Sequence, residues 1–159
     1  MWDPGFVYGS VLSARVLGWH RRFSLVSTAS WGTDANPGLC AVLHRGGTSW
    51  GRAFAVAPNS LDQALQTLDQ REAAYLRRDV WLEVIESGKR RRRQAITYVA
   101  NPAHPRLRAD LTRTEQLCLV RQGKGAKGTS RSYLQNTADC LTTDGHFHTD
   151  AHRFLAMIN

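Results

Sequence analysis

Apolar and polar residues alternate over several short stretches of the chain, a pattern typical of half-buried β-strands. The stretches run over residues 19–30, 39–43, 53–57, 80–85 and 95–100. Turn-forming residues separate them, among them residues 34–38 and the pair Gly46-Gly47, which is expected to end the second strand. We therefore expect the first three strands to form an antiparallel meander, and the last two a hairpin turning at residues 87–89.

A helical period lies between the third and fourth of these strands. Ser60 followed by Gln63 has the spacing of a capping box, which predicts a helix from about Leu61 to about Arg77. An apolar stripe then runs along one face of this helix through Leu61, Leu65, Leu68, Glu72 and Tyr75.

Glu72 is the anomaly in this stripe, because it puts a carboxylate on a face expected to pack against the core. Burial disfavours the charged form, so the pKa of such a group tends to rise towards the range that suits proton transfer. The alternative is a structural carboxylate that pairs with Arg71 or another arginine at the edge of the core. The stripe alone leaves both readings open.

The last third of the chain is predicted to be helical. Thr112 and Glu115 form a second capping box, and Gly123 is expected to end that helix. A further helix is predicted from about Ser130 to near Gly145, and a last one capped by Asp150. Strands that precede helices, with one helix inserted between strands, indicate the α+β fold class.

Length and composition fit one soluble globular domain over residues 1–159. The hydrophobic fraction is 42%, and 21 Lys and Arg residues outnumber 13 Asp and Glu residues, so the surface should attract anions. Cys40, Cys118 and Cys140 have neither disulfide-like nor zinc-ligand spacing and are expected to be free thiols in a reducing compartment. No apolar run is long enough for a membrane span and no signal peptide is recognisable, which predicts a cytoplasmic protein without membrane contact.

Four consecutive arginines, Arg90 to Arg93, could indicate a nucleic-acid-binding patch. They stand at the start of a hairpin strand, where alternate side chains point to water, and no aromatic-rich platform or recognition motif is evident beside them. A solvated hairpin is therefore the favoured interpretation, and no nucleic-acid partner is expected.

Two other segments have residue types found in binding sites. His146, His148 and His152 could suggest zinc, but Asp150 more naturally caps a helix there and no fourth ligand is identifiable, so no metal is expected. The segment 123–128 is rich in glycine but lacks the order of a phosphate-binding loop. It is read as a flexible loop before a helix, with exposed amides that could still hold an anion.

A set of segments in a fixed order resembles the ChaC-type family of glutathione-specific γ-glutamylcyclotransferases. The matching segments are Met1-Trp2-Asp3-Pro4-Gly5-Phe6, residues 17–23, Gly32-Thr33 with residues 36–39, Arg45-Gly46-Gly47, residues 68–72 and Tyr133-Leu134-Gln135-Asn136-Thr137. The resemblance implies a small mixed or antiparallel β-barrel with flanking helices. It also implies a reaction without a cofactor, in which glutathione is released as 5-oxoproline and cysteinylglycine.

The resemblance assigns the catalytic acid/base role to Glu72. It makes Tyr133 a residue on the substrate side. Arg71 is a further candidate contact for one of the two carboxylates of glutathione.

The chain departs from the family pattern at its N-terminus. In the family a first strand and a Tyr-Gly-Ser-Leu loop, whose amides hold the γ-glutamyl group, come directly before the segment that starts here at Met1. Tyr8-Gly9-Ser10 is read as a coincidental match, because no apolar strand precedes it. We therefore expect a domain that is incomplete at its N-terminus, with an exposed sheet edge through which it could pair with another chain.

Two alternatives stand beside the enzymatic reading. The first is a non-catalytic protein that binds a γ-glutamyl ligand or a partner protein through an incomplete site. The second is a basic nucleic-acid-binding module that uses the arginine run. The sequence does not determine the oligomeric state or the preferred γ-glutamyl substrate.

Overall fold

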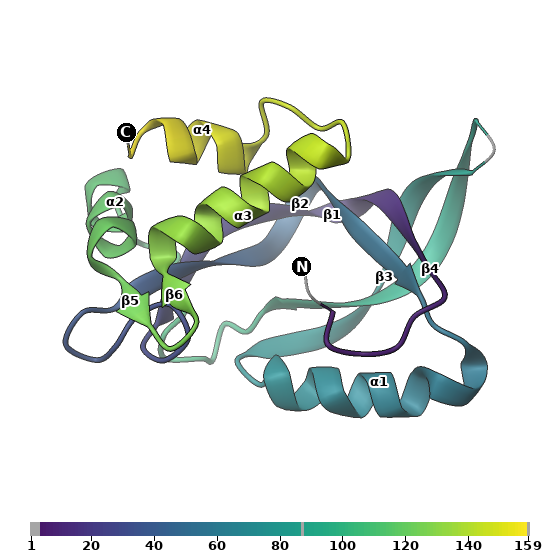
Figure 1. Ribbon diagram of the computed structural model, residues 1–159, viewed down its shortest axis with the longest axis horizontal. Helices are drawn as coiled ribbons and strands as arrows, with labels where there is room; N and C mark the ends of the chain where they lie inside the picture. The colour runs from purple at the N-terminus through teal and green to yellow at the C-terminus, as the bar shows by residue number, and fades with distance from the viewer. Residues whose placement is uncertain (1–3, 87, 159) are drawn as a thin grey trace. The chain divides into compact units, whose positions relative to one another are not determined.

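The computed structural model describes residues 4–86 and 88–158, and it has an α+β architecture (Figure 1). The elements in chain order are β1 (Ser10–Ser27), β2 (Gly38–Ala55), α1 (Pro58–Arg71), β3 (Tyr75–Glu86), β4 (Lys89–Ala100), α2 (Arg113–Gln122), β5 (Lys124–Gly125), β6 (Gly128–Thr129), α3 (Ser130–Thr143) and α4 (Asp150–Ala156). The four long strands form one sheet in the order β2-β1-β3-β4, and the two short ones pair separately. The predicted fold class is confirmed. Among the described residues the sheet is open, with β2 and β4 at its edges, rather than closed into a barrel.

The chain divides into two compact units that interleave along the sequence. The first comprises Met1–His20 and Leu43–Asn101, and the second comprises Arg21–Val42 and Pro102–Asn159. Each long strand β1 and β2 thus contributes one end to each unit.

The core of the first unit lies on one face of β1 and β3. These strands pair antiparallel, with Ala14 opposite Val84 and Val16 opposite Leu82. These four side chains are buried together with Val80, and partly buried residues including Trp19 and Leu43 pack against them. Every second residue from Val80 to Val84 is buried in β3. This agrees with the alternation of apolar and polar residues that predicted the strand.

Strand β2 continues through Gly46-Gly47 instead of ending there as predicted. Both glycines have positive φ, 93° and 69°, which glycine adopts at no steric cost, so the chain changes direction without leaving the sheet. His20 on β1 lies 2.8 Å from the carbonyl oxygen of Gly46 through its Nδ1 atom, which therefore donates. The predicted separate strands 39–43 and 53–57 are two parts of one element.

Helix α1 begins and ends earlier than its sequence pattern predicts. Pro58 is its first residue and Ala57 its N-cap, because proline suits the first helical turn, where its missing N–H is not needed. The predicted capping box at Ser60 is wrong, since Ser60 already lies inside the helix and its hydroxyl contacts Asn59 instead. The helix ends at Arg71, and Tyr75 already starts β3.

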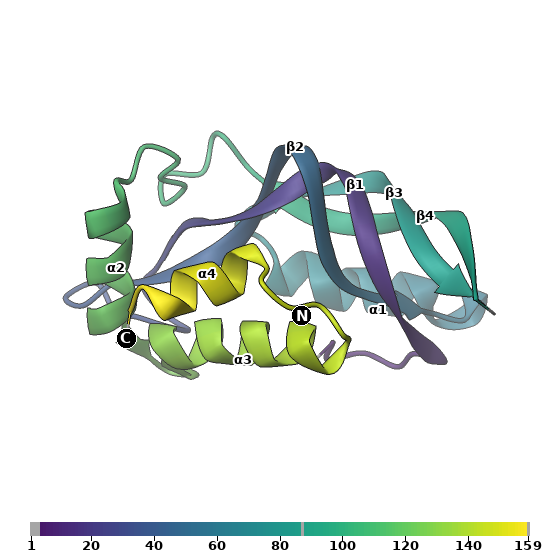
Figure 2. The ribbon, with the colours of Figure 1, turned by 90° about the horizontal axis from the view of Figure 1, so that it is seen from above.

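The second unit contains the remaining helices, and α3 and α4 lie side by side in it (Figures 1 and 2). The capping box of Thr112 and Glu115 is confirmed at the start of α2, as is the end of that helix at Gly123. One face of α3 is completely or almost completely buried, and it carries Leu134, Ala138 and Leu141. None of the helices in the described part of the chain is long and apolar enough to cross a membrane.

Helix α4 begins one residue from its predicted cap. Thr149 is the N-cap and Asp150 the first helical residue. The Nδ1 atom of His152 accepts a hydrogen bond from the backbone N–H of Thr149 (3.3 Å), and its Nε2 atom lies 2.8 Å from the hydroxyl of Thr142. His152 thus serves the start of α4, in the position that Glu usually takes in a capping box.

Candidate active site

Glu72 is the C-cap of α1, at the point where the helix turns into β3. Its backbone N–H donates to the Leu68 carbonyl, and its own carbonyl accepts from the N–H of Tyr75. The predicted core-facing stripe is wrong in extent, because the helix stops before Glu72 and Ala64 is its one fully buried residue. The carboxylate is still largely covered, with a side-chain exposure of 20%.

Arg71 connects Glu72 to the N-terminal segment. Its Nε donates to the Glu72 carboxylate (3.0 Å) and its Nη1 donates to the carbonyl of Pro4 (2.7 Å). Gly5 has φ 68°, and a Cβ there would lie 3.0 Å from the same Nη1 atom. One guanidinium therefore fixes the carboxylate and the Pro4-Gly5 backbone together. Met1, Trp2 and Asp3 of the family segment lie outside the described residues.

An ion-pair and hydrogen-bond cluster holds α1 onto the β3–β4 hairpin one turn before Glu72. Asp69 accepts from the guanidinium of Arg77 (2.7 Å) and from the hydroxyl of Tyr98 (2.6 Å). Burial, followed by the nearby Asp69 carboxylate, raises the pKa of Tyr98 well above its ordinary value, so the phenol stays protonated and donates. The end of α1 is thus tied to both strands of the hairpin.

The tripeptide Tyr8-Gly9-Ser10 leads into β1. The Tyr8 ring packs edge-on against Phe54 at 5.0 Å between centroids, and the N–H of Gly9 donates to the carbonyl of Ala55. These contacts hold the segment against the end of β2.

Tyr133 lies on α3 in the second unit. Its hydroxyl accepts from the backbone N–H of Ala41 on β2 (3.2 Å), and its ring packs against Trp31 at 5.1 Å between centroids. The structure therefore brings Arg71 and Glu72 together in the first unit and places Tyr133 in the second.

Ser130 is a buried polar residue of this region that the sequence pattern did not single out. It is completely buried one helical turn before Tyr133, and its hydroxyl accepts from the N–H of Leu39 and donates to the carbonyl of the same residue, both at 2.8 Å. Ser130 and Tyr133 together dock α3 on the backbone of β2. Ser130 and Tyr133 are three residues apart, and this spacing in the sequence indicates that they share one face of a helix.

We expect the substitution Ser130→Ala to lower the free energy of unfolding by about 1–3 kcal/mol, because it leaves a buried N–H and a buried carbonyl of Leu39 without a partner. Chemical denaturation measures this loss. Ser10→Ala, at an exposed serine at the start of β1, is the control and should change stability by less than about 0.5 kcal/mol. Equal stability of the two variants would contradict the docking role of Ser130.

The glycine-rich segment is a short hairpin of β5 and β6 rather than a flexible loop. The N–H groups of Ala126 and Lys127 donate to the carbonyls of Ala29 and Ser30. A Cβ on Gly125 would lie 2.4 Å from the carbonyl oxygen of Ala29, so glycine is needed here for close packing of two backbones. These two amides are consequently not available to an anion.

The four arginines of β4 are all exposed and alternate between the two faces of the sheet, as the hairpin interpretation predicted. Arg93 forms an ion pair with Glu86. Gly88 has φ 73° in the connecting turn, and Ser87 lies outside the described residues.

Comparison with known proteins decides the family. The family model described as "ChaC-like protein" matches residues 1–158. The chain belongs to the ChaC-like family. A glutathione-specific γ-glutamylcyclotransferase of Escherichia coli (strain K12) is 32% identical over 139 residues, which are 84% of this chain and 58% of that protein.

Two further similarities agree with this ChaC-like assignment. Glutathione-specific γ-glutamylcyclotransferase 1 of Mus musculus is 28% identical over 157 residues, which are 96% of this chain and 70% of that protein. A crystal structure of a γ-glutamyl cyclotransferase specific to glutathione from yeast has a TM-score of 0.85 at 18% identity, over 96% of this chain and 88% of the yeast chain. That likeness establishes the shared fold.

Proposed function

We propose that this ChaC-like chain is a lyase that converts glutathione to 5-oxoproline and cysteinylglycine, with Glu72 as the general acid/base. The observation that carries the proposal is the placement of a mostly covered carboxylate at the end of α1, fixed by Arg71 beside the Pro4-Gly5 backbone. The curated names of the Escherichia coli and Mus musculus relatives support glutathione as the substrate.

The reaction is an intramolecular aminolysis. The α-amino nitrogen of the γ-glutamyl unit attacks the γ-carbonyl carbon of the same unit, which closes a five-membered lactam. Glu72 accepts a proton from the attacking nitrogen and returns a proton to the cysteinyl nitrogen as the old amide bond breaks. Atoms balance without water, and the intramolecular geometry supplies much of the rate once the substrate is folded correctly.

Arg71 and Tyr133 are proposed to act on the substrate side. Arg71 donates to Glu72 and to the carbonyl of Pro4, and its positive charge beside Glu72 would attract a glutathione carboxylate. Tyr133 lies in a segment that matches the family pattern, and its phenolic hydroxyl is a group that can both donate and accept hydrogen bonds. We also propose a cytoplasmic location, because Cys40, Cys118 and Cys140 are not joined in disulfides in the part of the chain that the structure describes.

The test is to incubate the purified chain with glutathione and to quantify both products. We expect 5-oxoproline and cysteinylglycine in equal amounts, because one bond forms and one breaks within a single molecule. Glutamate in place of 5-oxoproline would mean hydrolysis and would contradict the mechanism. Thermal stabilisation by glutathione without either product would instead support a binding protein.

A further inference from the structure

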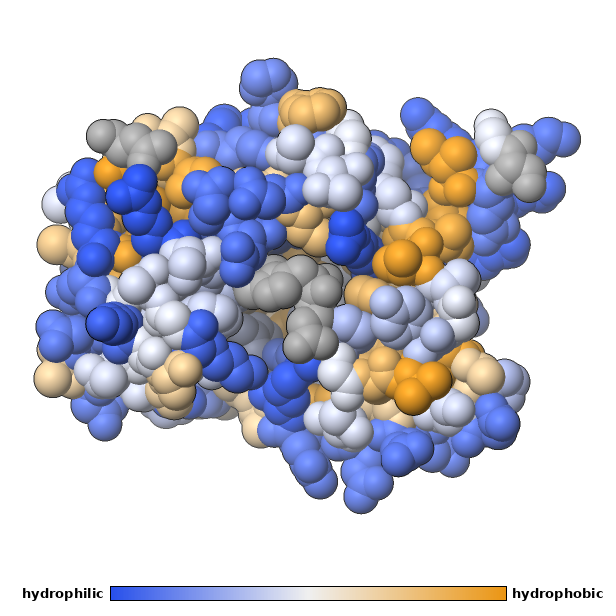
Figure 3. Space-filling model, in the orientation of Figure 1, coloured by the Kyte–Doolittle hydropathy of each residue, from blue (hydrophilic) through white to orange (hydrophobic). Residues whose placement is uncertain are grey.

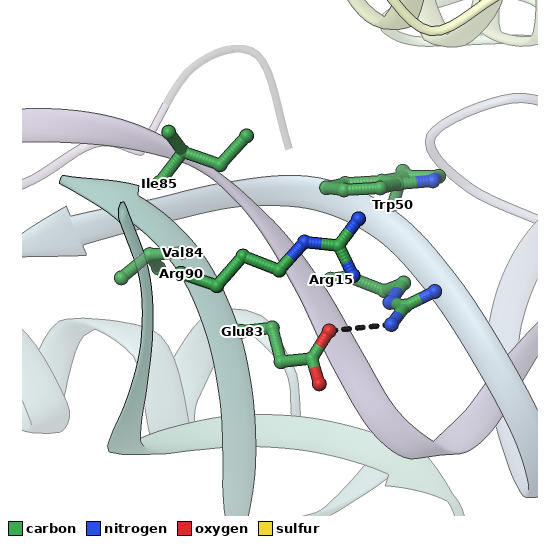
Figure 4. A pocket seen from close by; sticks show the side chains of 6 residues that line it. All are labelled: Arg15, Trp50, Glu83, Val84, Ile85 and Arg90. Carbon is green, nitrogen blue, oxygen red and sulfur yellow. Dashed lines mark hydrogen bonds and ion pairs between the residues drawn. The ribbon is translucent and has the colours of Figure 1, made fainter. Parts of the chain in front are cut away.

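A small hollow lies on the outer face of the sheet in the first unit. Residues of β1, β2, β3 and β4 line it, whereas Glu72 lies at the end of α1. It has a volume of about 30 Å³ and is lined by Arg15, Trp50, Glu83, Val84, Ile85 and Arg90 (Figure 4). The nucleic-acid and catalytic interpretations of the sequence gave no role to Arg15, Trp50 or Glu83.

Strand register brings three charged side chains into one row across the sheet. Arg15 on β1 lies opposite Glu83 on β3, and Glu83 lies opposite Arg92 on β4. Residues directly opposite in antiparallel strands share a face, so all three are on the outer side. Arg90 is opposite Ile85 and shares this face, whereas Arg91 is opposite the buried Val84 and belongs to the other.

Three arginines lie around the Glu83 carboxylate, and one of them, Arg15, contacts it directly. Arg15 forms an ion pair with Glu83, and its guanidinium also lies over the Trp50 ring at 5.7 Å from the centroid. Figure 4 shows the Arg90 side chain extending from β4 towards Trp50 and Arg15. The hydrogen bond from Arg15, and then the charges of Arg15, Arg90 and Arg92, hold the pKa of Glu83 below its ordinary value.

Positive charge and hydrogen-bond donors are in excess here. Three guanidinium groups face one carboxylate, which leaves two positive charges uncompensated within the cluster. The Nε atom of Arg15 is buried without a hydrogen-bond partner. The side chains of Arg90 and Arg92 make no hydrogen bond or ion pair within residues 4–86 and 88–158. A buried donor without a partner costs free energy, and so do like charges held close together.

We propose that this hollow is an anion site that binds the phosphate group of a small molecule. A phosphate carries close to two negative charges at pH 7, which matches the uncompensated charge, and its oxygens suit the forked donors of arginine. The hollow has room for oxygens of the group but not for a whole organic molecule, so the remainder of the ligand lies outside it.

The surface beside the hollow suits an organic remainder. Ile85 and Trp81 are 59% and 51% exposed on the same face of β3. Figure 3 shows hydrophobic side chains gathered beside hydrophilic ones on the β3–β4 hairpin, in the upper right of the view. A phosphate monoester with an apolar group can therefore cover part of this face while its phosphate meets the arginines.

Calorimetric titration with inorganic phosphate and with phenyl phosphate, at constant ionic strength in chloride, tests the site. We expect phenyl phosphate to bind more tightly than inorganic phosphate. Arg90→Ala should weaken both by about tenfold or more, because it removes a charge-assisted contact. Arg91→Ala is the matched control, since it removes the same charge from the same strand on the other face, and it should change affinity less than about threefold. Equal effects of the two variants would overturn the proposal.

Two further experiments distinguish phosphate binding at this site from general electrostatic attraction and from binding at the proposed active site. Glu83→Gln should tighten phosphate binding, because it removes the competing negative charge, whereas unchanged or weaker binding would overturn the inference. Glutathione should not displace phosphate from the site. The Arg90→Ala variant should still turn over glutathione. Displacement of phosphate by glutathione would assign the arginines to the substrate and overturn a separate site. Failure of glutathione turnover in the unaltered chain would contradict the proposed function alone.

Discussion

The substitution Glu72→Gln is expected to lower the rate of 5-oxoproline formation by about 10²- to 10⁴-fold, the range that general acid–base catalysis supplies. Glutamine preserves the size of the side chain and can still accept the hydrogen bond from Arg71, but it cannot take a proton from the substrate amine. The C-cap contacts of residue 72 use only its backbone and should persist. Folding should therefore survive while turnover is lost. Product formation from glutathione, measured at saturating substrate, gives the effect on kcat.

Asp62→Asn is the control for loss of an acidic charge on the same helix. Asp62 is exposed near the start of α1, and its substitution should leave kcat within about twofold. Thermal stabilisation of Glu72→Gln by glutathione should match that of the unaltered chain, because binding does not require the base. Equal turnover of the unaltered chain and Glu72→Gln would remove Glu72 from the mechanism.

Gly32→Ala is expected to destabilise the second unit by about 3 kcal/mol or more, at the upper end of the usual cost of overpacking. A Cβ at this position would lie 2.1 Å from the amide nitrogen of Gly38 and 2.3 Å from the carbonyl oxygen of Ser27. Both are backbone atoms, so no side chain can rotate away to make room. Chemical denaturation followed by circular dichroism measures the loss.

Gly9→Ala provides the comparison, because its Cβ would lie 3.8 Å from the nearest atom, the carbonyl oxygen of Ala55, and its backbone needs no positive φ. Its stability should stay within about 1 kcal/mol of the parent chain. If Gly32→Ala were as stable as Gly9→Ala, the close backbone contact of Gly32 with Ser27 and Gly38 would be wrong.

Local patterns predicted most of the elements but missed several of their ends. The alternation over 80–85 identified the centre of β3, and the Thr112–Glu115 pair identified the start of α2, since both depend on neighbouring residues. The start of α1 was missed because Pro58 and Ser60 both satisfy local rules for a helix start, and the proline lies first. The continuity of β2 through Gly46-Gly47 was missed because two consecutive glycines locally favour a turn, and only the pairing with the preceding strand β1 keeps the chain in the sheet.

The candidate site was predicted in part. The ordered family segments identified Glu72, Arg71 and Tyr133 as residues of interest, and the pairing of Glu72 with Arg71 was among the readings that the sequence left open. The contact from Arg71 to Pro4 joins residues 67 positions apart, and no local pattern reports such a contact. Ser130 stayed unnoticed for the same reason, because its partner Leu39 lies 91 positions away.

The sequence by itself determined the α+β class, the β3–β4 hairpin, the presence of the helices and the positive charge. These properties follow from composition and from interactions within a few residues, whereas the family resemblance came from comparing ordered segments with a known family. Only the tertiary structure decided that Glu72 ends a helix instead of continuing its stripe, and that Arg15, Glu83, Arg90 and Arg92 share one face of the sheet. Pairing between strands sets which side chains become neighbours, and patterns within a few residues of the chain do not report that pairing.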